Sequence, residues 1–260
     1  MGKWVLSILF FLNLFIILFF WWNGSASLFG TTVPNNLIAF AKLCGLMAVY
    51  AVLMQFVMRG RAIWVEEVFG LNNLFTAHRL NGYLVIILIY FHLTLMTLAY
   101  SMMGKTDFIS QIIDFFLHYE DVWMAMIAVC LFTLIVGISI YIVRSRLKYE
   151  IWYYVHLLTY VAILLAWGHQ LKLGSDFANQ MFVSYWYALY IIVFGNVLIF
   201  RFLRQIFLYQ KYQFRIEDIV KEADGATSIY IGGNSLERFH IQPGQFMILR
   251  FLDKKRWWEE

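Results

Sequence analysis

Six long apolar runs dominate this chain of 260 residues. A helix of about 20 apolar residues crosses the hydrocarbon core of a bilayer, and it satisfies its backbone hydrogen bonds within one segment. With 62% hydrophobic and only 14% charged residues, the composition excludes an ordinary soluble domain. We therefore expect an all-α membrane protein, a six-transmembrane-helix bundle, with spans at Trp4–Trp22, Leu37–Met58, Leu74–Met103, Val122–Val143, Ile151–Leu171 and Met181–Phe200.

The basic residues of the short loops predict the orientation of the bundle. One side has only Lys105 and Lys172, whereas the other has Lys3, Arg59, Arg61, Arg144, Arg146, Lys148, Arg201 and Arg204. Because cytoplasmic loops carry the excess of lysine and arginine, both termini are expected in the cytoplasm of a multi-pass protein of the cell (plasma) membrane. The net charge of +4 follows from this topology. We therefore expect the lipid bilayer as a partner, and no nucleic acid.

The loop GKTDFISQIIDFFLHYED, between the third and fourth spans, has apolar residues at helical spacing. This pattern predicts an amphipathic helix at the outer membrane surface. Its acidic residues either gather cationic electron acceptors or form a solvated polar face; they are Asp107, Asp114, Glu120 and Asp121.

The chain changes character after Tyr209. The stretches YQFRIEDIV, TSIYIGG and QFMILRFL are typical of strands, with turn signals at Asp224-Gly225 and Pro243-Gly244. Three strands alone would leave open edges and too small a core for an independent domain. We expect a transmembrane domain at 1–208 and an incomplete β-barrel segment at 209–260.

Two of the spans contain a pair of histidines each. His78 and His92 lie 14 residues apart in the third span, and His156 and His169 lie 13 apart in the fifth. At about 1.5 Å per residue, each pair covers roughly 20 Å along its helix. Since both spans start in the cytoplasm, His78 is expected to face His156 near the inner side, and His92 to face His169 near the outer side.

Two imidazoles that approach from opposite sides suit the axial positions of a haem iron. The four histidines therefore predict two haem groups, one above the other. Covalent haem is not expected, because the chain has no CxxCH motif. The alternative is that each histidine is only a hydrogen-bonding residue between helices, but four histidines matched in depth on two parallel spans favour haem.

Three residues near these levels are further candidates. Gly82, one turn after His78, either leaves room for the haem macrocycle or allows ordinary helix packing. Arg79 either pairs with a propionate of the inner haem or reaches to the cytosolic interface. Lys42 either holds a propionate of the outer haem, attracts an anionic acceptor, or reaches outward to the interface.

The spacing of His156 and His169 fits this arrangement less well. Residues 13 apart on a straight helix point about 140° away from each other, whereas residues 14 apart differ by only about 40°. We therefore expect a bulge or local unwinding in the fifth span, at Gly168.

Two stretches resemble a known family. GLMAVYAVLMQFVMRGRAIWVEEVFGLNNLFTAHRLNGYLVIILIYFH and YEIWYYVHLLTYVAILLAWGH are similar to the ferric reductase-like transmembrane domain, whose members include bacterial ferric reductase-like proteins and the NADPH oxidases. The tail YQFRIEDIVKEADGATSIYIGG, with FHIQPGQFMILRF after it, resembles the start of a ferredoxin-reductase-type FAD-binding domain.

The resemblance implies a direction of electron flow. In the family, cytosolic NAD(P)H reduces FAD, which passes single electrons to an inner haem, an outer haem and an acceptor outside. His78 and His156 would then ligate the inner haem b, and His92 and His169 the outer one. The implied enzyme is an NAD(P)H-dependent ferric reductase or NADPH oxidase-like oxidoreductase, and its acceptor is ferric iron or O2, which gives superoxide.

The family's flavin motif and its glycine-rich nicotinamide site do not occur in this sequence. FAD and NAD(P)H are therefore expected in the remainder of a longer protein or in a separate reductase.

Two other functions are alternatives for this sequence. A haem-bearing membrane subunit would pass electrons between a separate flavin reductase or quinone and a partner protein, as the haem-containing membrane subunits of methionine sulfoxide repair do. A transporter would bind a transition metal through the histidines, but it would need acidic or thiol partners at membrane depth. The third and fifth spans have no acidic residue near their histidines.

Overall fold

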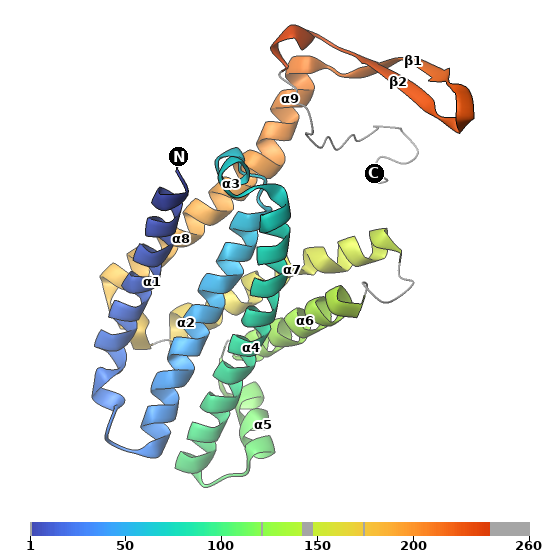
Figure 1. Ribbon diagram of the computed structural model, residues 1–260. Coiled ribbons are helices and arrows are strands. Elements are labelled where there is room, and N and C mark those ends of the chain that lie inside the picture. The colour runs from blue at the N-terminus through green and yellow to red at the C-terminus, as the bar shows by residue number, and fades with distance from the viewer. Residues whose placement is uncertain (1, 121, 142–147, 174, 240–260) are drawn as a thin grey trace. The chain divides into compact units, whose positions relative to one another are not determined.

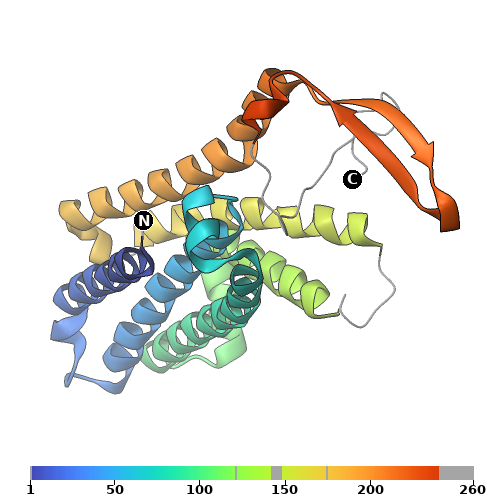
Figure 2. The same ribbon diagram turned by 45° about the horizontal axis from the view of Figure 1, so that its top comes forward.

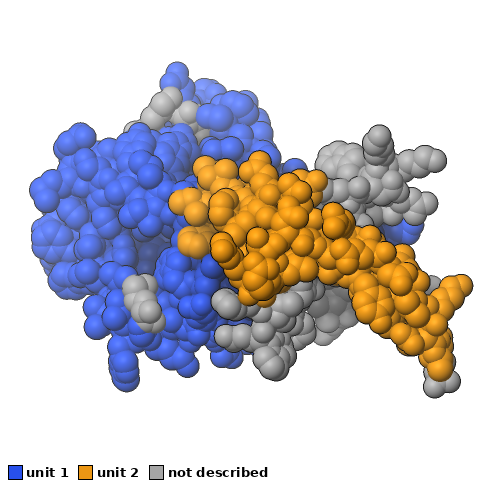
Figure 3. All heavy atoms as spheres, turned by 90° about the horizontal axis from the view of Figure 1, so that it is seen from above, with its two compact units in different colours: residues 1–197 blue, residues 198–260 orange. Residues whose placement is uncertain are grey.

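The computed structural model describes residues 2–120, 122–141, 148–173 and 175–239. It divides into two compact units, residues 1–197 and 198–260 (Figure 3). The first unit is helical, and the described strands belong to the second (Figure 1).

Six helices among the described residues are long and apolar enough to cross a membrane, and they lie where the sequence predicts them. The six expected spans are thereby present as helices, which suggests a multi-pass membrane protein. The helices are α1 (Lys3–Ser25), α2 (Val33–Arg59), α4 (Leu71–Gly104), α6 (Val122–Tyr141), α7 (Tyr149–Leu173) and α8 (Gln180–Val197). The sixth span continues into the second unit through a π-helical turn (Leu198–Leu203) and α9 (Arg204–Tyr212).

Short sequence signals start these helices. Thr32 caps α2 by accepting a hydrogen bond from the backbone N–H of Asn35, and a proline lies in the first turn. Gly70, whose φ is 74°, separates the short helix α3 (Ile63–Phe69) from α4, and glycine takes this backbone conformation at little cost. Two 3₁₀ turns, Ala26–Leu28 and Ser175–Ala178, lie in the connections of the bundle.

The predicted helix between the third and fourth spans is present as α5 (Phe108–His118). It buries Phe115 and Gln111, whereas Ile109, Ile113 and Leu117 are exposed. An apolar exposed face of this kind fits a helix that lies in the membrane surface.

Helix α2 is the centre of the bundle. Half of the residues in the most apolar 18-residue stretch of α2 are buried, compared with 11–17% of the residues in the same kind of stretch of the other candidate spans. Small residues, among them Ala41 and Ala51, bring its backbone close to α4. Gln55 Nε2 donates to the His78 carbonyl oxygen at 3.0 Å, and Asn81 Nδ2 donates to the Ala51 carbonyl oxygen at 2.8 Å. These bonds fix the register of the two helices.

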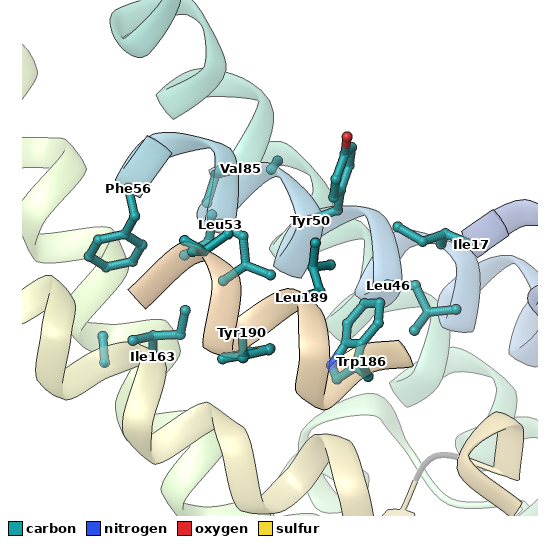
Figure 4. Packing of buried hydrophobic residues seen from close by; sticks show 14 of the residues in the cluster. Ile17, Leu46, Tyr50, Leu53, Phe56, Val85, Ile163, Trp186, Leu189 and Tyr190 are labelled. Atoms are coloured by element: carbon teal, nitrogen blue, oxygen red, sulfur yellow. The ribbon is translucent and has the colours of Figure 1, made fainter. Parts of the chain in front are cut away.

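Large apolar side chains fill the space between α2, α7 and α8. Leu53 and Phe56 on α2 pack with Ile163 on α7 and with Trp186 and Tyr190 on α8 (Figure 4). Leu53 is fully buried and Trp186 is 1% exposed. The first unit therefore has one continuous apolar core that positions α4 and α7.

The second unit contains a hairpin of β1 (Arg215–Lys221) and β2 (Thr227–Gly232). The strands are antiparallel, with an irregularity between Ile216 and Asp218, and Gly225 takes a φ of 77° in the predicted turn. Two of the three predicted strands are thereby present. The third, at 245–252, and the Pro243-Gly244 turn lie outside the described residues, so the two strands by themselves make no barrel.

Candidate functional site

The structure brings together the two members of each histidine pair that the sequence predicts at one level of the membrane. The ring centroids of His78 and His156 lie 6.1 Å apart, and those of His92 and His169 lie 6.0 Å apart. Helices α4 and α7 each begin seven residues before their first histidine, which places one pair near the start of both helices. The other pair lies about 20 Å further along them.

No bulge produces this pairing. Helix α7 is α-helical from Tyr149 to Leu173, so the expected local unwinding at Gly168 is wrong. Figures 1 and 2 show α7 running obliquely to α4. Side chains on opposite sides of one helix lie about 10 Å apart across its axis, and an oblique helix can therefore present both to the same neighbour. The crossing of the helices compensates for the 140° difference that the sequence predicts.

The spacing of the rings fits a metal between them. Since a metal–imidazole bond is about 2.0 Å long and a ring nitrogen lies about 1.1 Å from its centroid, two imidazoles on opposite sides of one iron have centroids about 6 Å apart. The backbones of α4 and α7 are not closely packed, unlike those of α2 and α4. The spacing of the rings is thus compatible with one metal ion between the two imidazoles at each level.

His92 is oriented by a backbone group. Its Nδ1 lies 2.8 Å from the Ala41 carbonyl oxygen on α2. A carbonyl can only accept, so Nδ1 carries the hydrogen and Nε2 keeps its lone pair for a metal. Gly45 makes this contact possible, because a Cβ at this position would lie 2.8 Å from His92 Nδ1.

His156 is oriented by residues of α6 and α7. Its Nδ1 lies 3.4 Å from Ser139 Oγ, and its ring is stacked on that of Trp152 with centroids 5.1 Å apart. His78 differs, since its buried Nδ1 has no hydrogen-bond partner among the described residues. The two ligands of the predicted inner site are therefore held differently.

The remaining candidates lie as follows. Gly82 faces α2, where a Cβ would lie 3.2 Å from Gln55 Nε2. This close contact fits the interpretation that the glycine allows helix packing. Arg79 is exposed on α4. The Arg59 guanidinium, which the sequence analysis used only for the orientation of the bundle, lies 4.4 Å above the Phe75 ring at the start of α4.

Lys42 does not reach outward to solvent. Its side chain is 8% exposed, and Nζ lies 2.9 Å from Asp176 Oδ1 and 3.1 Å from Ser25 Oγ. Burial raises the pKa of Asp176, and the adjacent Lys42 ammonium opposes this effect. Gly24 leaves room for the carboxylate, since a Cβ there would overlap Asp176 Oδ1. Lys42 thus joins α1, α2 and the α7–α8 connection, a contact that none of the three interpretations from the sequence included.

Two of the four acidic residues around α5 have local partners, whereas Asp121 lies outside the described residues. Asp107 caps the helix, and its hydrogen bonds with Ser110 and Ile109 lower the pKa of its carboxyl. Asp114 lies 2.8 Å from His118 Nδ1 and accepts from Gln111 Nε2 at 3.0 Å. These contacts favour the interpretation of a solvated polar face over one of a cation-gathering surface.

Comparisons with known proteins were made for the whole chain. Residues 44–167 match the model of a family described as ferric reductase like transmembrane component. This segment includes His78, His92 and His156, and it ends two residues before His169. Neither the curated proteins nor the solved structures contain a match to the chain. The matched segment suggests a transmembrane oxidoreductase.

Proposed function

We propose that the bundle is the haem-carrying part of a transmembrane oxidoreductase. His78 and His156 would be the axial ligands of an inner haem b, and His92 and His169 those of an outer one. The observation that carries this proposal is the pair of centroid distances, 6.1 and 6.0 Å, at two levels of the same two helices. Bound at both levels, haem would supply one-electron chemistry within the membrane.

The residues of the chain have three tasks in this function. The histidines provide four neutral imidazole nitrogens, and the bond from His92 Nδ1–H to Ala41 directs one of them. The buried core of α2, α7 and α8 excludes water from the space beside them. The roughly 20 Å between the two levels divides a hydrocarbon core of about 30 Å into shorter distances for electron transfer.

The donor and the acceptor follow from the resemblance and the loop charges. Basic loops support a cytosolic location of both termini, and hence a cytosolic donor that uses FAD and NAD(P)H in a further domain or a separate reductase. The acceptor would lie on the other side of the membrane and would be ferric iron or O2.

Metal transport is less well supported. Among the described residues, no group of three or more histidine, cysteine, aspartate or glutamate side chains could hold a metal ion. The histidines instead form pairs, and a haem iron needs two axial ligands because the macrocycle supplies the other four.

An optical spectrum of the purified protein, oxidised and then reduced with dithionite, tests the proposal. We expect bands of six-coordinate b-type haem and two haems per chain. His92→Ala and His156→Ala should each remove one haem, and His118→Ala, which changes a histidine outside the pairs, should remove neither. A colourless protein after haem has been supplied would overturn the proposal.

The acceptor is tested on the reduced protein alone. Reoxidation by a ferric chelate or by O2 supports the reductase. Reoxidation that requires an added partner protein or quinone supports the alternative of a haem-bearing subunit.

A further inference from the structure

We propose that Ser139 on α6 is a positioning residue for His156. Its hydroxyl group would fix which nitrogen of the His156 ring carries the hydrogen and would hold the plane of the ring. The inference rests on the proposed function, in which His156 is a haem ligand, but it concerns a residue of a different helix.

The hydrogen bonds of Ser139 determine the tautomer of His156. Ser139 Oγ donates its only hydrogen to the Ile135 carbonyl oxygen, at 2.7 Å, because a carbonyl cannot donate. Trp152 Nε1 donates to the same Oγ at 3.2 Å. Toward His156, the Ser139 oxygen is therefore left with acceptor capacity only, and Nδ1 must carry the hydrogen of the 3.4 Å contact. Nε2 is then the unprotonated nitrogen, as a metal ligand requires.

The same hydroxyl group also fixes the plane of the ring. Trp152 lies one helical turn before His156, and their rings are stacked with an interplanar angle of 27°. Since Ser139 accepts a hydrogen bond from the indole, it holds the surface on which the imidazole rests. One oxygen atom thus controls both the tautomer and the orientation.

The contact with Ser139 distinguishes His156 from His92 and His78. His92 donates to the backbone carbonyl of Ala41, which a substitution of Ala41 itself would not remove, and His78 Nδ1 has no partner among the described residues. A hydrogen bond from Nδ1–H makes an imidazole ligand more basic and orients it. Ser139 should therefore favour the oxidised iron of the inner site and lower its reduction potential.

Potentiometric titration of the haem-loaded protein tests the inference, with Ser139→Ala as the variant. We expect the midpoint potential of one haem to rise, the other to stay unchanged, and haem affinity at the changed site to fall about tenfold, the lower end for groups that orient a metal ligand. Ser139→Thr, which keeps the hydroxyl group, should restore both values.

The matched control is Thr133→Val on the same helix. Thr133 donates to the Val129 carbonyl oxygen as Ser139 does to that of Ile135, and it also bonds the Tyr90 hydroxyl on α4 at 3.0 Å. Among the described residues it contacts no histidine, so both potentials should stay as in the wild type. If Ser139→Ala does not fold, Ser139→Cys is titrated in its place. Because a thiol is a weaker hydrogen-bond acceptor than a hydroxyl group, this variant should raise the midpoint potential of the same haem.

The outcomes separate the two proposals. A wild-type protein without haem, or one in which His156→Ala removes none, contradicts the proposed function. If the wild type holds two haems and His156→Ala removes one, but the folded Ser139 variants keep both wild-type potentials, the inference about Ser139 alone is wrong.

Discussion

The buried ion pair between Lys42 and Asp176 offers a sharp test of the packing. The two side chains are 8% and 3% exposed, and their charged atoms lie 2.9 Å apart. Replacing one partner leaves the other charge buried and without its counter-ion, which destabilises a protein by about 3–5 kcal/mol. For a chain of this size, that loss corresponds to a fall in Tm of roughly 6–20 °C.

The contribution of the pair is separated from that of burial by a double-mutant cycle. We expect Lys42→Met and Asp176→Leu each to lower Tm strongly, whereas the double variant recovers most of the loss, because apolar residues can replace a buried pair with little change in stability. Ser25→Ala removes one hydrogen bond that the Lys42 ammonium donates and should destabilise by about 1.5–3 kcal/mol. Lys148→Met, at an exposed position, serves as the control for a lost charge.

Thermal unfolding in detergent, followed by circular dichroism, measures these effects. The reasoning is refuted if the losses of the two single variants add in the double variant, because additivity means that the charges do not interact. It is also refuted if either single variant is as stable as the Lys148→Met control.

Two further predictions concern the outer site and α5. Gly45→Ala should push the His92 ring away from Ala41 and lower haem affinity at one site about 10- to 100-fold, which is measured by counting haem per chain. The control is Gly137→Ala, which should keep both haems because a Cβ there meets nothing within 4 Å. The lowered pKa of Asp107 means that its stabilisation of α5 is present above the usual carboxyl pKa of 3.8 and is lost as the pH falls through the lower value of the folded protein. The protection of the Ile109 amide from hydrogen exchange, measured against the intrinsic exchange rate at each pH, should therefore fall on acidification. In Asp107→Asn, which keeps a capping side chain without the titration, this protection should stay constant.

The sequence by itself determined the membrane spans and the depths of the histidines. A run of about 20 apolar residues must be helical in lipid, so the spans could be placed with no knowledge of their neighbours. The 14- and 13-residue spacings likewise define two levels on any helix. These are local properties, and the structure has them where the sequence predicts them.

What surrounds the histidines was decided only by the tertiary structure. The carbonyl that binds His92 is 51 residues away in the chain, and Ser139 is 17 residues from His156. Asp176, the partner of Lys42, comes from the connection between α7 and α8. None of these partners is marked by a local pattern, because a hydrogen-bond partner is selected by which helix faces pack together.

The crossing of α4 and α7 gives the clearest reason for this difference. Helical periodicity gives the directions of side chains relative to their own axis, so His156 and His169 were expected to need a bulge between them. The angle between two axes depends instead on the packing of α2, α7 and α8, in which residues as far apart as Leu53 and Trp186 share one core. Helical periodicity therefore determined which histidines lie at the same level along the two helices. The packing of the helices decided that both pairs come into contact.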